Sequence, residues 1–525
     1  MTDSRLTIHE LVEGSFLIEY PELTESEANK RSLAGAAALD RERPPGYLGS
    51  VPGARTLYVE FDPGTADRTM LDALLGASEV SPGSTSDRAH TIPVVYGGEG
   101  GPDLVELARQ ADLSPEEFAR RHARASYRVA FLGFAPGFAY LTGLAPELHA
   151  PRLATPRTRV AAGTVAIGGP YTGIYPGETP GGWRLIGRTN VALFDPDADP
   201  PSRFLPGDGV RFEAVAQLEP IAMPAAARRE SAGRPPGDPV FRVAAPGAFS
   251  SIQAGPRHDW LRAGVPPGGA MDLAALRRGN ESLGNPAEAA ALEMTLVGAE
   301  LETTAAAAVC LSGAQPSAAV NGRPIGAGEV VTLNPGDRIA VARILDGMRS
   351  YLCVAGGLRQ SSRPRLSPRL AKGDMLFAPS SDPQLPASSP VRVRVPSRGL
   401  HQAAAVVRVV LGPHRDHYTQ EGLATFLSSL YRVSGASDRR GIRLEGPSIH
   451  LALPADIPPE GTPLGGIQVA NDGLPIVLGP DRPVTGGYSR IATIVRDDFP
   501  LLAQAAPGTS LRFARVDLAL RRPPE

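Results

Sequence analysis

Apolar and polar residues alternate along two stretches near the start of the chain, residues 6–21 and residues 54–61. A period of two is typical of strands that bury one face. The stretches between and after them, residues 24–40 and residues 65–75, are predicted to be helices. The resulting order of strand, helix, strand and helix predicts a small α+β domain over residues 1–85.

A β pattern resumes at residues 90–96, and two helices are then expected at residues 103–110 and residues 114–124. The second of these opens with the sequence Ser-Pro-Glu-Glu. Ser114 is expected to cap the helix, proline suits the first helical position, and Glu117 stands where a capping box needs its acidic residue. These signals place a helix boundary at Ser114.

The segment from residue 131 to residue 189 is dense in glycine and proline and carries only short apolar pieces. No helix of ordinary length fits after Gly143, so short strands joined by tight turns are expected. Loops on a rigid β scaffold commonly carry functional side chains. The side chains expected on these turns are Phe134, Phe138, Tyr175, Trp183, Arg157, Arg159, Arg188 and Glu178.

Residues 219–238 are rich in proline, alanine and arginine and show no periodicity, which predicts an interdomain linker. A second module follows it. Two helices separated by Gly284 are expected near its start, the second of them capped by Asn285. Strands are expected to dominate after Leu296.

Residues 464–495 repeat features of the glycine-rich and proline-rich segment in the first half of the chain. The sequence Gly-Gly-Tyr-Ser-Arg-Ile, which starts at Gly486, matches Gly-Gly-Trp-Arg-Leu-Ile, which starts at Gly181. The strands that close the two regions also match, Pro-Gly-Asp-Gly-Val-Arg-Phe against Pro-Gly-Thr-Ser-Leu-Arg-Phe. The repeat predicts related β-barrels in both modules.

The chain has 525 residues, which exceeds what one hydrophobic core usually supports, so two to four domains are expected. With 42% apolar residues, 21% charged residues and a formal net charge of −2, nothing in the composition favours nucleic acid or an acidic membrane surface. No window approaches about 18 consecutive apolar residues, and the first residues do not resemble a secretion signal. We therefore expect a cytoplasmic protein with no membrane segment.

Cysteine and lysine are both scarce. Cys310 and Cys353 lie in apolar runs, where a buried thiol acts as a small hydrophobe, and two cysteines are too few for a disulfide framework. Lys30 and Lys372 are the only lysines. Neither follows a phosphate-binding glycine-rich loop and neither lies between methionines, so the sequence has no P-loop and no biotin-carrying lysine of the usual kind.

Motifs in both modules resemble a known enzyme family. The runs GFAPGFAYL, ATPRTRVAAGTVAIGG and TGIYPGETPGGWRLIGRT resemble the B-type component of the bacterial ATP-dependent 5-oxoprolinase, over residues 6–215. The runs GVPPGGAMD, LCVAGG, SDRRGIRLEGP and GGIQVANDGLPI resemble its C-type component, over residues 243–516. These families have also been called allophanate hydrolase subunits 1 and 2 and sporulation-kinase inhibitor, and they are related to the carboxyltransferase region of urea carboxylase. The chain thus resembles a fusion of the two components.

The resemblance implies a mainly β fold with α+β elements, with cyclophilin-like β-barrels in both modules and two of them in the second. The implied domains are a small α+β domain at 1–85, a carboxyltransferase C/D-type barrel at 86–218, the linker at 219–238, the first half of an A/B-type module at 239–394, and its second half, a barrel, at 395–525.

Arg157 and Arg159 are expected to flank a turn, two residues apart, and to point the same way. Together with Arg188 they could clamp a carboxylate or a phosphate, and Glu178 could act as an acid or a base. Solvated arginines and an exposed turn glutamate are the plainer alternative. The residues predicted to bind substrate are Phe134, Tyr175, Asp272, Asp438, Arg439, Gln468, Asp472, Tyr488 and Arg490.

Three positions depart from the pattern of the relatives. Ala254 stands where they carry an aspartate, residues 361–374 lack their glycine-rich loop, and Arg490 replaces a lysine, which keeps the charge but cannot release a proton at neutral pH. The fold should survive these changes, whereas catalysis by the second module is left open. His414 and His417 alone are too few ligands to predict a transition-metal site.

The leading hypothesis is the fused B/C component of an ATP-dependent 5-oxoprolinase, which would use ATP with magnesium to phosphorylate the lactam carbonyl and would need a separate A-type subunit. The alternatives are a carboxyltransferase that works with a separate biotin protein and a non-catalytic regulator of a histidine kinase. An allophanate amidase fits least, because no Gly-Ser-Ser-rich nucleophile segment occurs. No nucleic-acid or membrane partner is expected, and homo-oligomerisation is left open.

Overall fold

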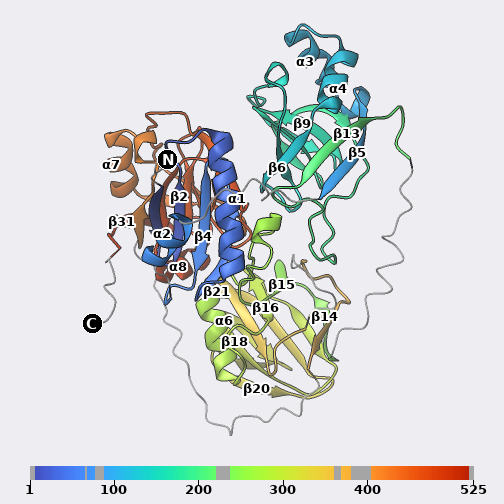
Figure 1. Ribbon diagram of the computed structural model, residues 1–525. Coiled ribbons are helices and arrows are strands. Elements are labelled where there is room, and N and C mark those ends of the chain that lie inside the picture. Colours follow the sequence, from blue (N-terminus) through green and yellow to red (C-terminus); the bar gives the residue numbers. More distant parts are fainter. Residues whose placement is uncertain are drawn as a thin grey trace.

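The computed structural model describes residues 6–65, 68–76, 88–219, 237–359, 368–379 and 404–518. These residues form three lobes: a barrel, an open sheet, and a third lobe in which the N-terminal domain lies beside the C-terminal barrel (Figure 1). Most of the predicted linker, and half of the segment in which the glycine-rich loop of the relatives is missing, lie outside the described residues.

The N-terminal domain is the predicted α+β unit. Its four-stranded sheet has the order β1-β2-β4-β3, and a helix follows each strand pair. The first helix begins after Thr24. The Thr24 hydroxyl accepts from the Glu27 backbone N–H, and the Glu27 carboxylate accepts from the Thr24 backbone N–H, which completes a capping box. The bounds are β1 Thr7–Val12, β2 Ser15–Glu19, α1 Glu25–Glu42, β3 Tyr47–Pro52, β4 Thr56–Phe61 and α2 Arg68–Gly76.

The first barrel closes in the order β10-β7-β6-β13-β5-β12-β9. Two helices precede β6, and Ser114 caps the second by accepting from the Glu117 backbone N–H at 3.2 Å. The Glu117 carboxylate instead pairs with Arg120 and Arg121, so only half of the expected capping box forms. The bounds are β5 Ala89–Tyr96, η1 Gly98–Gly100, α3 Leu104–Gln110, α4 Pro115–Arg124, β6 Tyr127–Leu132, β7 Ala139–Thr142, η2 Pro146–Leu148, β9 Thr164–Gly168, β10 Tyr171–Ile174, β12 Arg184–Arg188 and β13 Gly209–Ala214.

A separate two-stranded ribbon, β8 Arg157–Val160 with β11 Thr179–Gly181, stands outside the barrel wall.

The first half of the second module is a nine-stranded sheet, with the main path β15-β16-β21-β17-β14-β22. The expectation of two barrels in this module is therefore wrong, because this half does not close on itself within the described residues. The bounds are β14 Asp238–Ala245, β15 Phe249–Gln253, η3 Leu261–Ala263, α6 Leu273–Ser282, β16 Ala291–Thr295, β17 Glu300–Thr303, β18 Ala307–Val320, β19 Arg323–Ile325, β20 Val330–Leu333, β21 Arg338–Val354 and β22 Met375–Ala378.

The second predicted helix of this module does not form. Asn285 does not cap a helix: its side-chain amide donates to Asn280 and to the Val354 carbonyl, and its side-chain oxygen accepts from Gly356. The apolar residues after it form β16, which lies between β15 and β21. Burial in the middle of a sheet thus overrides the local helix signals.

The C-terminal barrel closes in the order β23-β30-β27-β28-β25-β24-β31 and has its own outer ribbon, β26 with β29. Each barrel contains one parallel pair, β5 with β13 and β23 with β31. This shared topology confirms the predicted repeat. The bounds are β23 Ala405–Leu411, η4 Arg415–His417, α7 Gln420–Ser428, β24 Tyr431–Val433, β25 Gly441–Glu445, β26 Asp456–Gly461, β27 Gly466–Val469, β28 Pro475–Leu478, β29 Thr485–Tyr488, β30 Arg490–Ile494, η5 Arg496–Asp498, α8 Phe499–Ala503 and β31 Ser510–Arg515.

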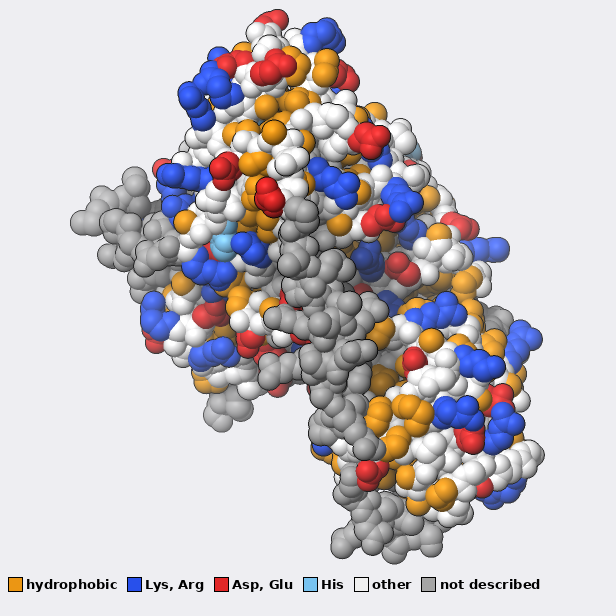
Figure 2. Space-filling model, turned by 90° about the vertical axis from the view of Figure 1, so that its right-hand side faces the viewer, with side chains coloured by type: hydrophobic (Ala, Val, Ile, Leu, Met, Phe, Trp, Pro, Cys, Tyr) orange, Lys and Arg blue, Asp and Glu red, His pale blue; other side chains and the backbone are white. Residues whose placement is uncertain are grey.

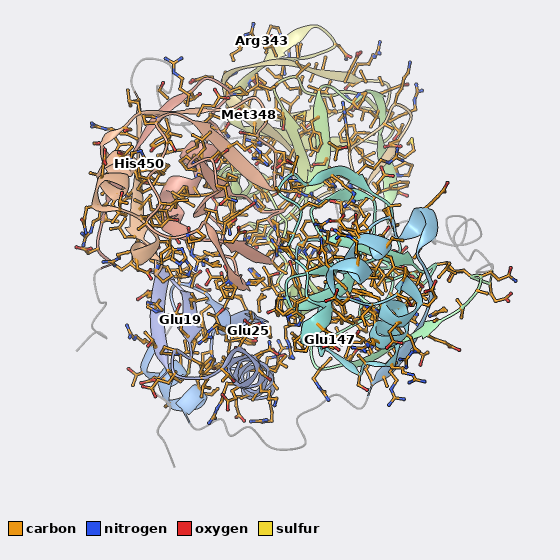
Figure 3. The ribbon with its side chains drawn as sticks, turned by 90° about the horizontal axis from the view of Figure 1, so that it is seen from above. Glu19, Glu25, Glu147, Arg343, Met348 and His450 are labelled. Atoms are coloured by element: carbon orange, nitrogen blue, oxygen red, sulfur yellow. The ribbon has the colours of Figure 1, made fainter. Side chains whose placement is uncertain are left out.

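The lobes meet through specific contacts. The Tyr171 hydroxyl of the first barrel donates to Glu25 at the start of α1, which Figure 3 shows at the boundary of the N-terminal domain. Cys310 and Cys353 are buried free thiols that face each other across β18 and β21, as expected for small hydrophobes.

No described helix is long and apolar enough to cross a membrane. Acidic and basic side chains are interspersed on the face shown in Figure 2.

Candidate functional site

Arg157 and Arg159, which were expected to flank a turn, lie on strand β8 instead, and they have different partners. Arg157 donates to the Asp103 carboxylate at 2.8 Å. Asp103 is buried and also accepts from the backbone of Leu185 at 2.7 Å, so this pair anchors the ribbon to the barrel. Arg159 pairs instead with Glu178 at 2.6 Å, and both side chains are exposed. The catalytic roles predicted for these residues stay predictions.

Arg188 is exposed at the end of β12. Tyr175 is buried among the barrel's aromatic rings, with Phe138 at 5.4 Å between centroids, so it belongs to the core. Phe134 is half-buried and has a φ of +65°. It lines a cavity shared with the second module.

Several predicted residues of the second module stabilise their own turns. Asp438 accepts from the backbone of Arg440 and Gly441, and Asp472 accepts from the backbone of Leu474. Gln468 is buried and donates to the carbonyl of half-buried Tyr488 at 3.3 Å. These polar side chains thus have hydrogen-bond partners within the protein, and their presence can be explained without a bound ligand.

Arg490 lies fully inside the C-terminal barrel, 2.8 Å from the Glu460 carboxylate. His414 lies 3.4 Å from the same carboxylate and accepts the Arg490 backbone N–H through Nδ1. Burial opposes ionisation of Glu460, but Arg490 and His414 outweigh it and hold the pKa of this carboxyl below its usual value. Arg490 therefore neutralises a buried acid. Within the described residues, no group of three or more His, Cys, Asp or Glu is placed to hold a metal.

A cleft of about 1250 Å³ opens between the N-terminal domain, the open sheet and the C-terminal barrel. All three contribute carboxylates to its lining, and the open-sheet half and the C-terminal barrel also contribute arginines. Its charged lining residues are Glu60, Asp62, His258, Asp272, Arg277, Arg278, Glu288, Asp346, Arg482, Arg496 and Asp497. Of these, sequence analysis singled out Asp272 alone.

Glu60, on β4, is the centre of a buried charge cluster at the cleft. Arg496 donates to it at 3.1 Å and Tyr58 at 3.0 Å, while Arg482 and His258 lie 3.9 and 3.8 Å away. Burial raises the pKa of Glu60, but Arg496, His258 and Arg482 together outweigh burial, so this pKa lies below its usual value. Burial is also the main reason that the pKa of His258 is lowered. The cluster was missed because its members come from segments that share no motif.

Asp272 caps α6 by accepting from Ala275 at 2.9 Å, and it also accepts from the Gln504 amide at 2.8 Å. Its own backbone N–H donates to the Tyr351 hydroxyl at 2.8 Å. Tyr351 donates in turn to Glu293 at 2.7 Å. Asp272 is thus the cleft end of a buried hydrogen-bonded chain.

Arg439 is the other end of that chain. It donates to Glu293 at 2.6 Å, to Asp481 at 2.8 Å and to the Gly269 carbonyl at 2.6 Å. Burial raises the pKa of Glu293, but the positive charges of Arg439 and, to a smaller extent, Arg349 outweigh burial. The pKa of Glu293 therefore lies below its usual value. Arg439 lines a second cavity of about 460 Å³, on the far side of the residues it binds. The structure therefore gathers Asp272, Arg439, Asp438 and Phe134 around two neighbouring cavities.

The size and the lining of the cleft can be compared with the needs of a nucleotide with its magnesium. Its volume suits a ligand of that size, and carboxylates and arginines are the groups that bind magnesium and phosphate. The buried Nε of Arg278 has no hydrogen-bond partner among the described residues, so an unused donor lies in the cleft lining. The residues present are compatible with ATP and magnesium, whose binding stays a prediction.

Comparison with known families agrees with the two-module architecture. Residues 6–204 match the family described as carboxyltransferase domain, subdomain C and D. Residues 263–515 match carboxyltransferase domain, subdomain A and B.

Curated relatives match the two parts separately. The chain is 35% identical to the B-type 5-oxoprolinase subunit of Bacillus subtilis over 228 residues, 41% of this chain and 95% of that protein. It is 56% identical to the B-type 5-oxoprolinase subunit of Escherichia coli O157:H7 over 130 residues, 25% of this chain and 59% of that protein. It is 30% identical to the C-type 5-oxoprolinase subunit of Escherichia coli K12 over 286 residues, 53% of this chain and 92% of that protein.

The solved structure of TTHA0988 is similar over nearly the whole length, with a TM-score of 0.83 and 34% identity, covering 97% of this chain and 100% of that one. The chain is also 28% identical to the urea amidolyase of Lachancea kluyveri over 54% of this chain, which is 17% of that longer protein.

Proposed function

The chain belongs to the family of B-type and C-type 5-oxoprolinase subunits, with both types in one polypeptide, and we propose that it activates 5-oxoproline with ATP for ring opening. One observation carries the proposal: both parts build the large cleft. Glu60 of the B-type part forms one wall, and Asp272 and Arg496 of the C-type part face the same space. Either part alone would leave the cleft without one of its walls.

The chemistry supports the use of ATP. A lactam is a poor electrophile, and phosphorylation of its carbonyl oxygen creates a leaving group. In this step the lactam oxygen bonds to the γ-phosphorus while the bond from that phosphorus to ADP breaks, and ADP leaves. Arg278, Arg482 and Arg496 line the cleft and would stabilise the charge on the transferred phosphoryl group. Water would then open the ring with the help of a separate A-type subunit.

The test is reconstitution. The full chain should co-purify with an A-type 5-oxoprolinase subunit, and the complex should consume 5-oxoproline only when ATP and magnesium are present. Arg278→Met should lower this activity at least ten-fold, because an unpaired cleft donor is removed. Arg512→Met, at an exposed position on β31 outside the cleft lining, is the matched control and should keep wild-type activity. A complex that forms but never consumes 5-oxoproline would contradict the proposal.

Carboxyl transfer with a separate biotin protein is the second candidate, since both halves match carboxyltransferase families. Avidin added to the reconstituted complex distinguishes the two. Under our proposal avidin and chelators selective for transition metals leave the activity unchanged, whereas inhibition by avidin would favour carboxyl transfer.

A further inference from the structure

The smaller cavity lies at the junction of the two modules. One wall is the loop Phe134, Ala135 and Pro136 of the first barrel, and the opposite walls come from the open sheet and from turns of the C-terminal barrel. Met348, another lining residue, is half-buried on strand β21 of the open sheet and is labelled in Figure 3. The remaining lining residues are Phe249, Gly264, Pro266, Thr295, Arg349, Ser437, Asp438, Arg439, Arg440, Asp481, Arg482 and Pro483.

The Phe134 loop is held in a strained conformation. Phe134 has a φ of +65°, and Ala135 N–H donates to the Gly133 carbonyl at 2.7 Å, which makes a γ-turn with Phe134 at its centre. Positive φ is rare for a bulky residue and costs on the order of 1–3 kcal/mol. The ring packs edge-on against Phe138 and Tyr175, which fixes its direction. The strained turn sets this aromatic ring at the cavity.

Close packing between the modules fixes the cavity's shape. A Cβ at Gly133 would lie 1.5 Å from the Thr485 hydroxyl, and a Cβ at Gly264 would lie 3.0 Å from the Leu132 Cβ. The Ser202 hydroxyl also donates to the Ala263 carbonyl across the same junction. The two modules are therefore fitted together at the cavity itself, with no room for side chains at these glycines.

The lining of the cavity carries more arginines than carboxylates. Its lining includes four arginines and two aspartates. Arg439 pairs with both Glu293 and Asp481, and the Asp438 carboxylate accepts from the backbone of its own turn. Arg349 is 5% exposed, and its Nε has no hydrogen-bond partner in the part of the chain that the structure describes. Arg440 is exposed, and its side chain forms no ion pair with the described residues. A buried unpaired donor favours an anionic ligand.

We propose that this cavity binds a small ring that carries one carboxylate. The carboxylate meets Arg349 and Arg440, and the ring packs against Phe134, Phe249 and the prolines. The volume of about 460 Å³, the apolar side chains of the lining and its arginines suit such a molecule. The B-type part thus completes a site on the C-type part. Where the ligand is 5-oxoproline, the inference rests on the function proposed above.

Only a thin partition separates this cavity from the cleft. Residues 264–270 and residues 480–483 line both cavities between them, and Gly268 N–H donates to the Pro480 carbonyl at 3.2 Å. Arg439 joins both segments by binding the Gly269 carbonyl and Asp481. Arg482 lines both cavities. A ring carboxylate in the smaller cavity would therefore lie directly behind the wall of the proposed nucleotide cleft.

The test is direct binding to the full chain, measured by calorimetry with three probes. These are 5-oxoproline, cyclopentanecarboxylate, which lacks the lactam, and 2-pyrrolidinone, which lacks the carboxylate. The two acids should bind, and 2-pyrrolidinone should bind at least ten-fold more weakly. Ala135→Phe, which fills the cavity, and Arg440→Met, which removes its exposed charge, should each raise Kd for both acids at least ten-fold. Arg512→Met should leave Kd unchanged, and thermal unfolding checks that the variants fold.

The outcomes separate this inference from the proposed function. Acids that bind as expected to a chain whose complex never consumes 5-oxoproline would keep the cavity assignment and reject the function. An active complex in which Ala135→Phe and Arg440→Met keep the wild-type KM for 5-oxoproline would overturn the cavity assignment. Equal Kd values for 2-pyrrolidinone and the two acids would also overturn the cavity assignment.

Discussion

Replacing Arg439 with methionine should destabilise the second module strongly. The side chain of Glu293 is fully buried, and without Arg439 its donors among the described residues would be the Tyr351 hydroxyl and the Met271 backbone N–H. Removing one partner of a buried ion pair typically costs about 3–5 kcal/mol. The loss of the bonds to Asp481 and to the Gly269 carbonyl acts in the same direction. We therefore expect Arg439→Met to lower the free energy of unfolding by about 3–5 kcal/mol.

The measurement is a double-mutant cycle with Glu293→Gln, followed by urea unfolding and by hydrogen exchange over residues 264–270 and 480–483. Since both residues serve one contact, the double variant should cost at least about 2 kcal/mol less than the sum of the single variants. Exchange should increase in both partition segments. Additive costs, or a loss below about 1 kcal/mol for Arg439→Met, would refute the assignment of this pair as the partition's main ionic contact.

The pH dependence of the same variant has a definite sign. Glu293 has a lowered pKa in the folded chain, so it stabilises the fold above its ordinary pKa, and this stabilisation is lost as pH falls through the folded value. In Arg439→Met the carboxyl loses its main compensating charge and protonates more readily. The difference in stability between wild type and variant should therefore be largest near neutral pH and should shrink in acid.

Three further predictions concern the first barrel. Arg157→Ala should cost about 1.5–3 kcal/mol because it leaves buried Asp103 without its cation, whereas Arg159→Ala should change stability by less than about 0.5 kcal/mol; equal effects in urea unfolding would contradict this difference. Burial lowers the pKa of His122 to about 3, so its contribution is fully present above pH 6.5 and is lost toward pH 3. A His122→Gln variant should lack the corresponding slope of up to about 1.4 kcal/mol per pH unit, and a wild-type slope would count against a neutral buried histidine. Gly133→Ala should destabilise the module junction by about 1–3 kcal/mol through overpacking against Thr485, and a Thr485→Gly change should recover part of the loss; unchanged thermal unfolding of the single variant would show that the junction is loose.

Local patterns predicted the pieces of this fold well. Thr24 and Ser114 start helices because a hydroxyl that accepts from a backbone N–H three residues later is a local contact that the sequence alone specifies. The repeat of Gly-Gly-aromatic motifs led to the paired barrels, since the same turn chemistry recurs wherever the same strands must close. The predicted helix after Asn285 failed because the stretch that follows it is buried within a sheet, and this information is not local.

The candidate site was predicted only where a motif marked it. Asp272 and Arg439 were singled out in glycine-rich and Asp-Arg-Arg-Gly motifs, and both lie at the cavities. Arg157 was expected in an anion clamp, but a carboxylate 54 positions earlier in the chain, Asp103, binds it. The partner of a charged side chain depends on which strands the fold brings together.

The sequence by itself determined most of the element types, the helix starts at Thr24 and Ser114, the two-module order and the buried thiols, because these follow from contacts between residues close in the chain and from the period of apolar positions. Only the tertiary structure decided the cleft and the smaller cavity. Glu60 and Arg496 are 436 positions apart, and Phe134 lies about 300 positions from Arg439, so no local pattern relates them. Burial then gives these pairs their chemistry, since water no longer screens the charges once the three lobes close around them.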